Sequence, residues 1–169
     1  MANSTTAPKP DVMAIRGELT QTHAAFATLL ASLSPGDWRQ EGAASAWSVG
    51  ELIAHITWSV EQLPREIAAA RRDKGMFNMP AWLRDPLSLV YTRWLARGYA
   101  PHSAVQRYAA AIAAVDGLLD TVRDDEWQRG ARFYGERFYS IAELCHTPWQ
   151  HLAEHQATIR RILGEKSGS

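Results

Sequence analysis

Apolar residues recur at intervals of three and four along four long stretches of this chain. These stretches lie within residues 12–33, 49–63, 104–122 and 141–163. Such spacing places apolar side chains on one face of an α-helix. A shorter stretch over residues 87–97 also has helical character, and strand patterns do not alternate with helices anywhere. We therefore expect an all-α fold, a four-helix bundle with an additional short helix.

Several expected helices begin at a serine followed three residues later by Glu or Gln, the pattern of a capping box. The pairs are Ser48 with Glu51, Ser103 with Gln106, and Ser140 with Glu143. Pro64 predicts a kink or an early end of the second helix. Gly98 and Gly164 are expected to end the short helix and the final helix.

Two segments outside these helices are expected to form loops. Residues 74–86 carry glycine and two prolines and indicate a loop, and residues 126–139 are rich in aromatic residues without a helical period. The second segment predicts an ordered loop, with room for a short hairpin, before the last helix. Thr147 and Pro148 resemble a helix start. The final helix is therefore either kinked at Pro148 or divided into two helices that meet at Thr147.

Length and charge narrow the class of protein. The chain has 169 residues, 18 basic and 18 acidic side chains and one cysteine. This length predicts a single domain over residues 11–164, with disordered tails at 1–10 and 165–169. Zero net charge argues against a nucleic-acid or anionic-membrane partner. Cys145 cannot form an intramolecular disulfide, and no apolar leader is evident, so a cytoplasmic location is expected.

The histidines carry the strongest chemical signal. His151 and His155 are one helical turn apart, a spacing that lets two imidazoles bind one metal ion. The alternative is that both rings hydrogen-bond to neighbouring helices. A catalytic metal commonly has three protein ligands and one open position. His55, on the second helix, is the candidate third ligand, although a lone histidine there is also compatible with a boundary residue that has its own hydrogen bonds.

These residues resemble a known family. The segments Trp47–Ile56 (WSVGELIAHI), His151–His155 (HLAEH) and Leu33–Trp38 (LSPGDW) are similar to the motifs of the DinB/YfiT-like four-helix-bundle superfamily. The resemblance implies a divalent metal, nickel or zinc, held by His55, His151 and His155. It also implies a low-molecular-weight thiol as a second cofactor, because some members are thiol-dependent isomerases or S-transferases.

Residues near these ligands are the candidate pocket. We expect Trp58, Tyr134, Phe138, His146 and Trp149 to line it, with core packing as the alternative for the aromatic residues. Arg129, Arg132 and Arg137 could bind an acidic ligand or form a solvated cluster. Glu51 is interpreted as a helix cap rather than a base, and Cys145 as a buried, unreactive thiol.

Two functions remain at this point. The first is a metal-dependent S-transferase, isomerase or hydrolase that acts on small electrophiles. The second is a non-catalytic, stress-related bundle that binds a metal or a small molecule. In both, the expected partners are a small molecule and a second copy of the chain in a homodimer, with no nucleic acid and no membrane.

Overall fold

The computed structural model describes residues 10–43, 45–135 and 137–167 of the 169-residue chain. Its elements, in chain order, are α1 (Val12–Ser32), a 3₁₀ helix η1 (Asp37–Arg39), α2 (Val49–Ala70), α3 (Ala81–Ala96), α4 (Pro101–Leu119), β1 (Gly130–Arg132), β2 (Phe138–Ser140) and α5 (Ile141–Ser167). Of the expected tails at 1–10 and 165–169, residues 1–9 and 168–169 lie outside the described residues, and residues 165–167 belong to α5. The expectation of an all-α bundle with an extra helix is confirmed.

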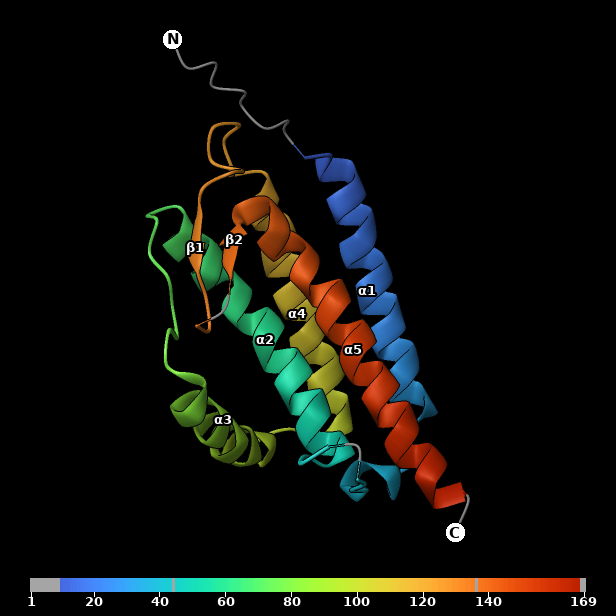
Figure 1. Ribbon diagram of the computed structural model, residues 1–169. Helices are drawn as coiled ribbons and strands as arrows, with labels where there is room; N and C mark the ends of the chain where they lie inside the picture. The colour runs from blue at the N-terminus through green and yellow to red at the C-terminus, as the bar shows by residue number, and fades with distance from the viewer. Residues whose placement is uncertain (1–9, 44, 136, 168–169) are drawn as a thin grey trace.

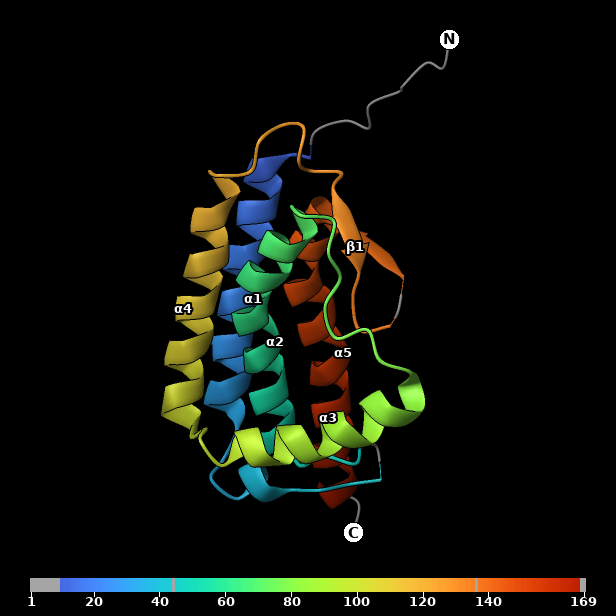
Figure 2. The same ribbon diagram turned by 90° about the vertical axis from the view of Figure 1, so that its left-hand side faces the viewer.

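Four helices form the bundle, and α3 lies outside it. Figure 1 shows α1, α2, α4 and α5 side by side, with α2 and α5 running in opposite directions. Figure 2 shows α3 crossing in front of the lower parts of α2 and α5. The helix α2 is central to the packing, since it contacts α3, α4 and α5. None of the described helices combines the length and apolarity needed to cross a bilayer.

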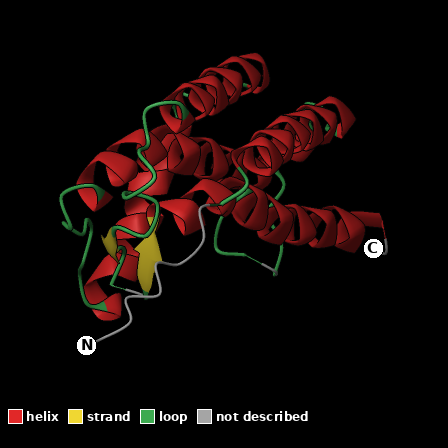
Figure 3. Ribbon diagram, turned by 90° about the horizontal axis from the view of Figure 1, so that it is seen from above, coloured by secondary structure: helices red, strands yellow, loops and turns green. Residues whose placement is uncertain are grey.

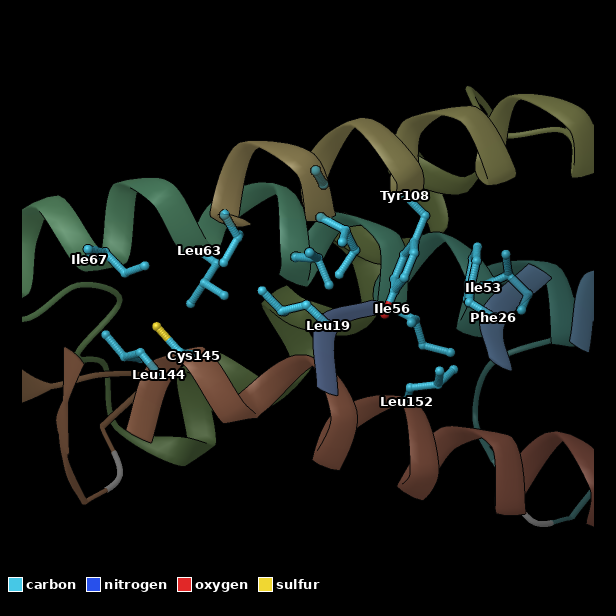
Figure 4. Packing of buried hydrophobic residues seen from close by; sticks show 14 of the residues in the cluster. Leu19, Phe26, Ile53, Ile56, Leu63, Ile67, Tyr108, Leu144, Cys145 and Leu152 are labelled. Carbon is cyan, nitrogen blue, oxygen red and sulfur yellow. The ribbon is translucent and has the colours of Figure 1, made fainter. Parts of the chain in front are cut away.

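The core is apolar and continuous along the bundle. Figure 4 shows side chains of α1, α2, α4 and α5 directed toward one another, among them Ile56 from α2 and Leu152 from α5. Phe26 stacks on Tyr108 with ring centroids 3.9 Å apart. Burying these apolar side chains supplies the main driving force for helix association. The fold therefore rests mainly on this apolar core.

A two-stranded hairpin precedes α5, as the aromatic segment suggested. The strands β1 and β2 pair in antiparallel fashion, with Ala131 opposite Tyr139. Seen from above, they lie at one side of the helices (Figure 3). The capping pair of Ser140 and Glu143 then starts α5, because each side chain accepts a hydrogen bond from the other residue's backbone N–H. This part of the sequence interpretation is confirmed.

Prolines mark fewer boundaries than expected. The sequence leaves two alternatives open at each of two prolines, a kink or an early end at Pro64 and a kink at Pro148 or two helices meeting at Thr147. The early end and the division into two helices do not occur, because α2 and α5 continue through Pro64 and Pro148. In α5, the Thr147 hydroxyl donates to the Leu144 carbonyl at 2.7 Å. That carbonyl would otherwise lack a donor, because the proline four residues later has no N–H.

Other helix ends also differ from the expectations. The helix α3 begins at Ala81 rather than residue 87, with Pro80 in extended conformation just before it. A proline at that place removes no intrahelical hydrogen bond. The helix α4 begins at Pro101, and Ser103 lies inside the first turn, where its hydroxyl accepts from the backbone N–H of Ala100. Finally, α5 extends beyond Gly164 to Ser167, since glycine permits a helix end without requiring one.

Candidate metal centre and cavity

Three histidines from two helices meet at one point. His55 comes from α2, and His151 and His155 come from α5. The ring centroid of His55 lies 4.9 Å from that of His151 and 5.1 Å from that of His155. The ring centroids of His151 and His155 are 4.4 Å apart. One nitrogen from each ring lies within 4.8 Å of the others. The antiparallel packing of α2 against α5 thus brings together residues that are distant in the sequence.

The start of α2 is fixed close to His55. The Ser48 hydroxyl accepts from the backbone N–H of Glu51, and the Glu51 carboxylate accepts from the backbone N–H of Ser48 at 2.8 Å. This confirms Glu51 as a capping residue. The preceding residue, Trp47, places its indole ring 4.7 Å from the His55 ring. Capping and stacking together define where the His55 side chain lies.

Burial keeps these imidazoles neutral. It lowers the pKa of His55 to about 4, with a smaller contribution from His155. Burial also lowers the pKa of His151 well below its usual range, and the two neighbouring histidines add to the effect. The pKa of His155 is lowered by burial and raised in part by Glu154. At neutral pH each ring therefore has a lone pair available for a ligand or a metal.

One nitrogen in this cluster has no hydrogen-bond partner. The Nε2 atom of His151 is buried, and no group in the described part of the chain bonds to it. The Nε1 atom of Trp47 is also buried, and no described group hydrogen-bonds to it. Leaving a buried polar atom unpaired costs about 1–3 kcal/mol. Three neutral imidazoles with an unsatisfied nitrogen fit a divalent transition ion such as zinc or nickel, for which imidazole is a favoured ligand.

A cavity of about 870 Å³ begins at the three histidines. It runs between α2 and α5 and is bounded by α3, by the segment before α3 and by the hairpin. Its α2 wall consists of His55, Trp58, Ser59, Val60, Gln62, Arg65 and Glu66, and its α5 wall of Leu144, Thr147, Pro148, His151 and His155. Figure 2 shows this face, with α3 and the segment before it in front of α2 and α5.

Aromatic rings form much of the cavity roof. Trp58 meets Tyr91 of α3 edge to face at 5.4 Å, and Phe77 stacks on Tyr134 at the same centroid distance. Phe77 and Tyr134 both have a left-handed backbone, with φ of 56° and 59°. This conformation is uncommon for bulky residues and is concentrated at functional sites. These rings form a largely apolar wall along the passage that leads to the histidines.

Comparison with known proteins agrees with this geometry. A family model described as the DinB superfamily matches residues 18–159. The chain belongs to the DinB superfamily. No functionally curated protein matches it at a significant level. This match confirms the family resemblance that the motifs around the three histidines indicated.

Two solved structures share the DinB fold of this chain. One is the mycothiol-dependent maleylpyruvate isomerase, with a TM-score of 0.67 and 12% identity over 89% of this chain. The chain spans 61% of the length of that isomerase. The other is an uncharacterised protein from Escherichia coli UTI89, with a TM-score of 0.66 and 13% identity over 97% of this chain and 98% of that one. At such low identity, these likenesses establish the fold.

The structure brings only some of the expected pocket residues of this DinB protein to the cavity. Trp58 and Tyr134 line it. His146 faces α1, where its Nδ1 atom lies 3.0 Å from Glu18. Trp149 and Phe138 are 42% and 50% exposed and do not line the cavity. His146 and Trp149 are five and two residues from His151, which places them on other faces of α5.

The hairpin explains the position of Phe138. Successive side chains of a strand point to opposite faces. In β2 it is Tyr139 that faces the cavity, so Phe138 faces solvent. The arginines of this region also form ion pairs elsewhere: Arg129 with Asp73 and Arg137 with Glu143, both at 2.6 Å. Neither these two nor Arg132 lines the cavity.

The sequence interpretation missed Gln62 and Glu66. Glu66 is 4% exposed and accepts a short hydrogen bond from the Tyr134 hydroxyl. Burial raises its pKa to about 7, and the Tyr134 hydrogen bond opposes part of that rise. A signal was present in the sequence: His55, Trp58, Ser59, Gln62 and Glu66 follow one another at helical spacing. This stripe lies beside the apolar face that was used to define the helix.

Proposed function

We propose that this DinB-family protein binds nickel or zinc through His55, His151 and His155 and is a metal-dependent enzyme that acts on small electrophiles. The observation that carries the proposal is the buried, unpaired Nε2 atom of His151 within a cluster of three neutral imidazoles. A metal ion bound by these rings would satisfy that atom and join α2 to α5.

Three protein ligands would leave a coordination position directed at the cavity. A divalent ion at such a site lowers the pKa of a thiol or water molecule that occupies the open position. The chain's own residues then have separable tasks. The histidines would hold the ion, Trp47 packs against His55, and the aromatic roof supplies an apolar wall for the passage. A deprotonated thiol in that passage is a strong nucleophile toward an electrophilic carbon.

A low-molecular-weight thiol is the co-reactant that we favour. The structural neighbour that is named for an activity is a mycothiol-dependent isomerase, which supports thiol use within this fold. The passage between α2 and α5 is large enough for both a thiol and an electrophile, because ligand pockets commonly measure about 300–1,000 Å³. The expected reaction is addition of the whole thiol to the electrophile: a new bond forms between the thiol sulfur and the electrophilic carbon, the thiol loses its proton, and the electrophile either releases a leaving group or takes up a proton. An isomerisation or hydrolysis would proceed through such an addition and release the thiol again.

Metal binding is tested by calorimetric titration of the chelator-treated protein with Zn²⁺ and Ni²⁺. We expect one ion per chain and a higher melting temperature, because a ligand that binds only the folded state stabilises it. His155→Ala should lose stoichiometric binding and remain folded, since the core is apolar. His102→Ala is the matched control, because His102 is exposed on α4. Equal binding by His155→Ala and wild type would overturn the metal assignment.

Turnover is tested separately. The metal-loaded protein is incubated with a panel of electrophiles, with and without thiols that include mycothiol and bacillithiol, and with His55→Ala in parallel. We expect conversion of an electrophile by the wild type alone, with consumption of the thiol only if the reaction is a transfer. If the wild type binds metal but shows no turnover beyond that of the variant, the protein is a non-catalytic binding bundle.

A further inference from the structure

The cavity has a second polar end. Glu66 follows His55 by eleven positions on α2, which corresponds to about three helical turns and ~16 Å along the axis. The rotation over eleven residues is within about 20° of a whole number of turns, so both side chains lie on one face. Both line the same cavity, with Trp58, Ser59 and Gln62 between them. The passage therefore connects the three imidazoles to a buried carboxyl group.

Glu66 is held in place by the hairpin. Its Oε1 atom accepts from the Tyr134 hydroxyl, and the Tyr134 ring stacks on Phe77 at an interplanar angle of 9°. The Tyr134 carbonyl in turn accepts from the Arg84 guanidinium of α3. Contacts from α2, from the segment before α3 and from α3 thus hold Tyr134 in place, with its hydroxyl against the Glu66 carboxyl. Among the described residues, no other group hydrogen-bonds to Glu66, so its second oxygen can still accept a donor.

The basic side chains that line the cavity are directed to other partners. Arg65 donates to the Gln62 amide oxygen at 3.2 Å, and Arg84 pairs with Asp85 at 2.9 Å. Neither forms an ion pair with Glu66 in the described part of the chain. The ionised form of a carboxyl that is almost fully buried is costly unless a cation lies beside it, so a ligand that brings a cation would stabilise that form.

We propose that Glu66 and Tyr134 form a second ligand-binding subsite, which takes an ammonium or hydroxyl group at the far end of an extended ligand whose near end lies at the histidines. The inference rests on the proposed function in that its ligand is anchored at the metal. It adds that the ligand spans the passage, with a hydrogen-bond donor about 16 Å from the anchored group.

The chemistry of the subsite selects a donor. A carboxyl and a phenol oxygen both accept hydrogen bonds, and the buried carboxyl gains most from a positively charged donor. The raised pKa of Glu66 agrees with this, since a cation beside it would restore the ionised form. A carboxylate-ended ligand would instead face repulsion from Glu66. The aromatic walls between the two ends suit an apolar connecting chain.

The test measures binding to the zinc-loaded protein by isothermal titration calorimetry. The probes are undecanethiols that end in an amino, hydroxyl, methyl or carboxylate group, with cysteamine as the short thiol. We expect the amino-ended and hydroxyl-ended probes to bind roughly tenfold or more tightly than the methyl-ended probe, and the carboxylate-ended probe to bind most weakly. The ranking of the amino and hydroxyl probes distinguishes the two donors.

Variants assign the preference to the subsite. Glu66→Gln and Tyr134→Phe should each reduce the amino-over-methyl preference roughly tenfold and leave zinc stoichiometry and cysteamine affinity unchanged. Melting temperatures establish that each variant is folded. The matched control is Glu61→Gln, because Glu61 is also on α2 but pairs with Arg107 outside the cavity.

The outcomes separate the two proposals. If no thiol binds the zinc-loaded wild type, thiol use in the proposed function is wrong. If all long thiols bind with equal affinity whatever their end group, the subsite is wrong while thiol binding stands. An equal loss of preference in Glu61→Gln would also overturn the subsite.

Discussion

Glu66 and His55 lie on the same face of α2, and burial moves their pKa values in opposite directions. It raises the pKa of the Glu66 carboxyl to about 7 and lowers that of the His55 imidazole to about 4. In both residues burial favours the neutral form. The passage is thus lined at neutral pH by one carboxyl close to its midpoint of ionisation and by uncharged imidazoles.

Glu66 should make the folded state less stable as the pH rises. Between about pH 4.5 and 7, the folded protein retains a proton on Glu66 that the unfolded chain has released. The free energy of unfolding therefore falls with pH over this window, by up to about 3 kcal/mol for this group. The measurement compares urea unfolding of the metal-free wild type and Glu66→Gln at several pH values in that window.

The difference between the two proteins isolates Glu66. The histidines contribute equally to both, with the opposite sign, because their lowered pKa values make stability rise as pH increases toward neutrality. We expect the stability of wild type relative to Glu66→Gln to decrease from pH 5 to pH 7. Parallel pH profiles for the two proteins would contradict the raised pKa.

At the scale of elements, the segment between α2 and α3 is joined to the hairpin. Met76 and Phe133 form a bridge, and the Asn78 amide donates to the Arg132 carbonyl at 2.8 Å. Gly75 lies against the same carbonyl: a Cβ atom added there would be 2.1 Å from Arg132 O. The roof of the cavity therefore depends on close contact between two irregular segments.

Gly75→Ala should loosen this contact. The backbone of Arg132 cannot move without shifting Phe133 and Tyr134, so we expect a loss of about 1–3 kcal/mol in the free energy of unfolding. The control is Gly17→Ala, at an exposed position of α1 where no atom lies within 4 Å of the added Cβ. That change should be neutral or stabilise by about 0.5–1 kcal/mol. Equal stability of the two variants would contradict the close contact.

Helix types and order followed from the sequence, whereas several helix ends did not. Apolar spacing and the Ser48 and Ser140 capping pairs are local signals, and they predicted the bundle and two of its helix starts correctly. The effect of a proline depends on its surroundings instead. Pro148 does not end α5, because the Thr147 hydroxyl donates to the carbonyl that the proline leaves free. The apolar periodicity of the sequence does not show that the Thr147 hydroxyl takes the place of the missing backbone donor.

At the scale of the whole molecule, convergence of the three histidines was predictable, but the cavity was not. The histidines lie on helices that must pack face to face, and they lie close together in the structure as expected. The cavity depends on how α3, the segment before it and the hairpin cover α2 and α5. Phe138 and Tyr139 are adjacent aromatic residues, and the alternation of side chains along β2 decides that Tyr139 faces the cavity and Phe138 does not.

Cys145 offers a measure of global opening. Its side chain is fully buried between helices, and burial raises its pKa to about 12, with Glu18 as a further cause. The thiolate is the reactive form, so a disulfide reagent should modify the folded protein far more slowly than the protein in urea. We expect the native rate to increase with denaturant in parallel with unfolding. Modification of the native protein at the rate of a free thiol would contradict this burial.

His55 and His151 are separated by about a hundred residues, and α5 follows every other described helix in chain order. At typical rates of synthesis, roughly 5 to 20 s pass between the two residues leaving the ribosome's catalytic centre. By the end of that interval α1, α2 and α4 have been made, and their apolar faces can associate. During synthesis, therefore, no ion can be held by all three histidines until α5 has been made. An ion at the proposed centre would accordingly be bound late in synthesis, after the other helices of the bundle have been made.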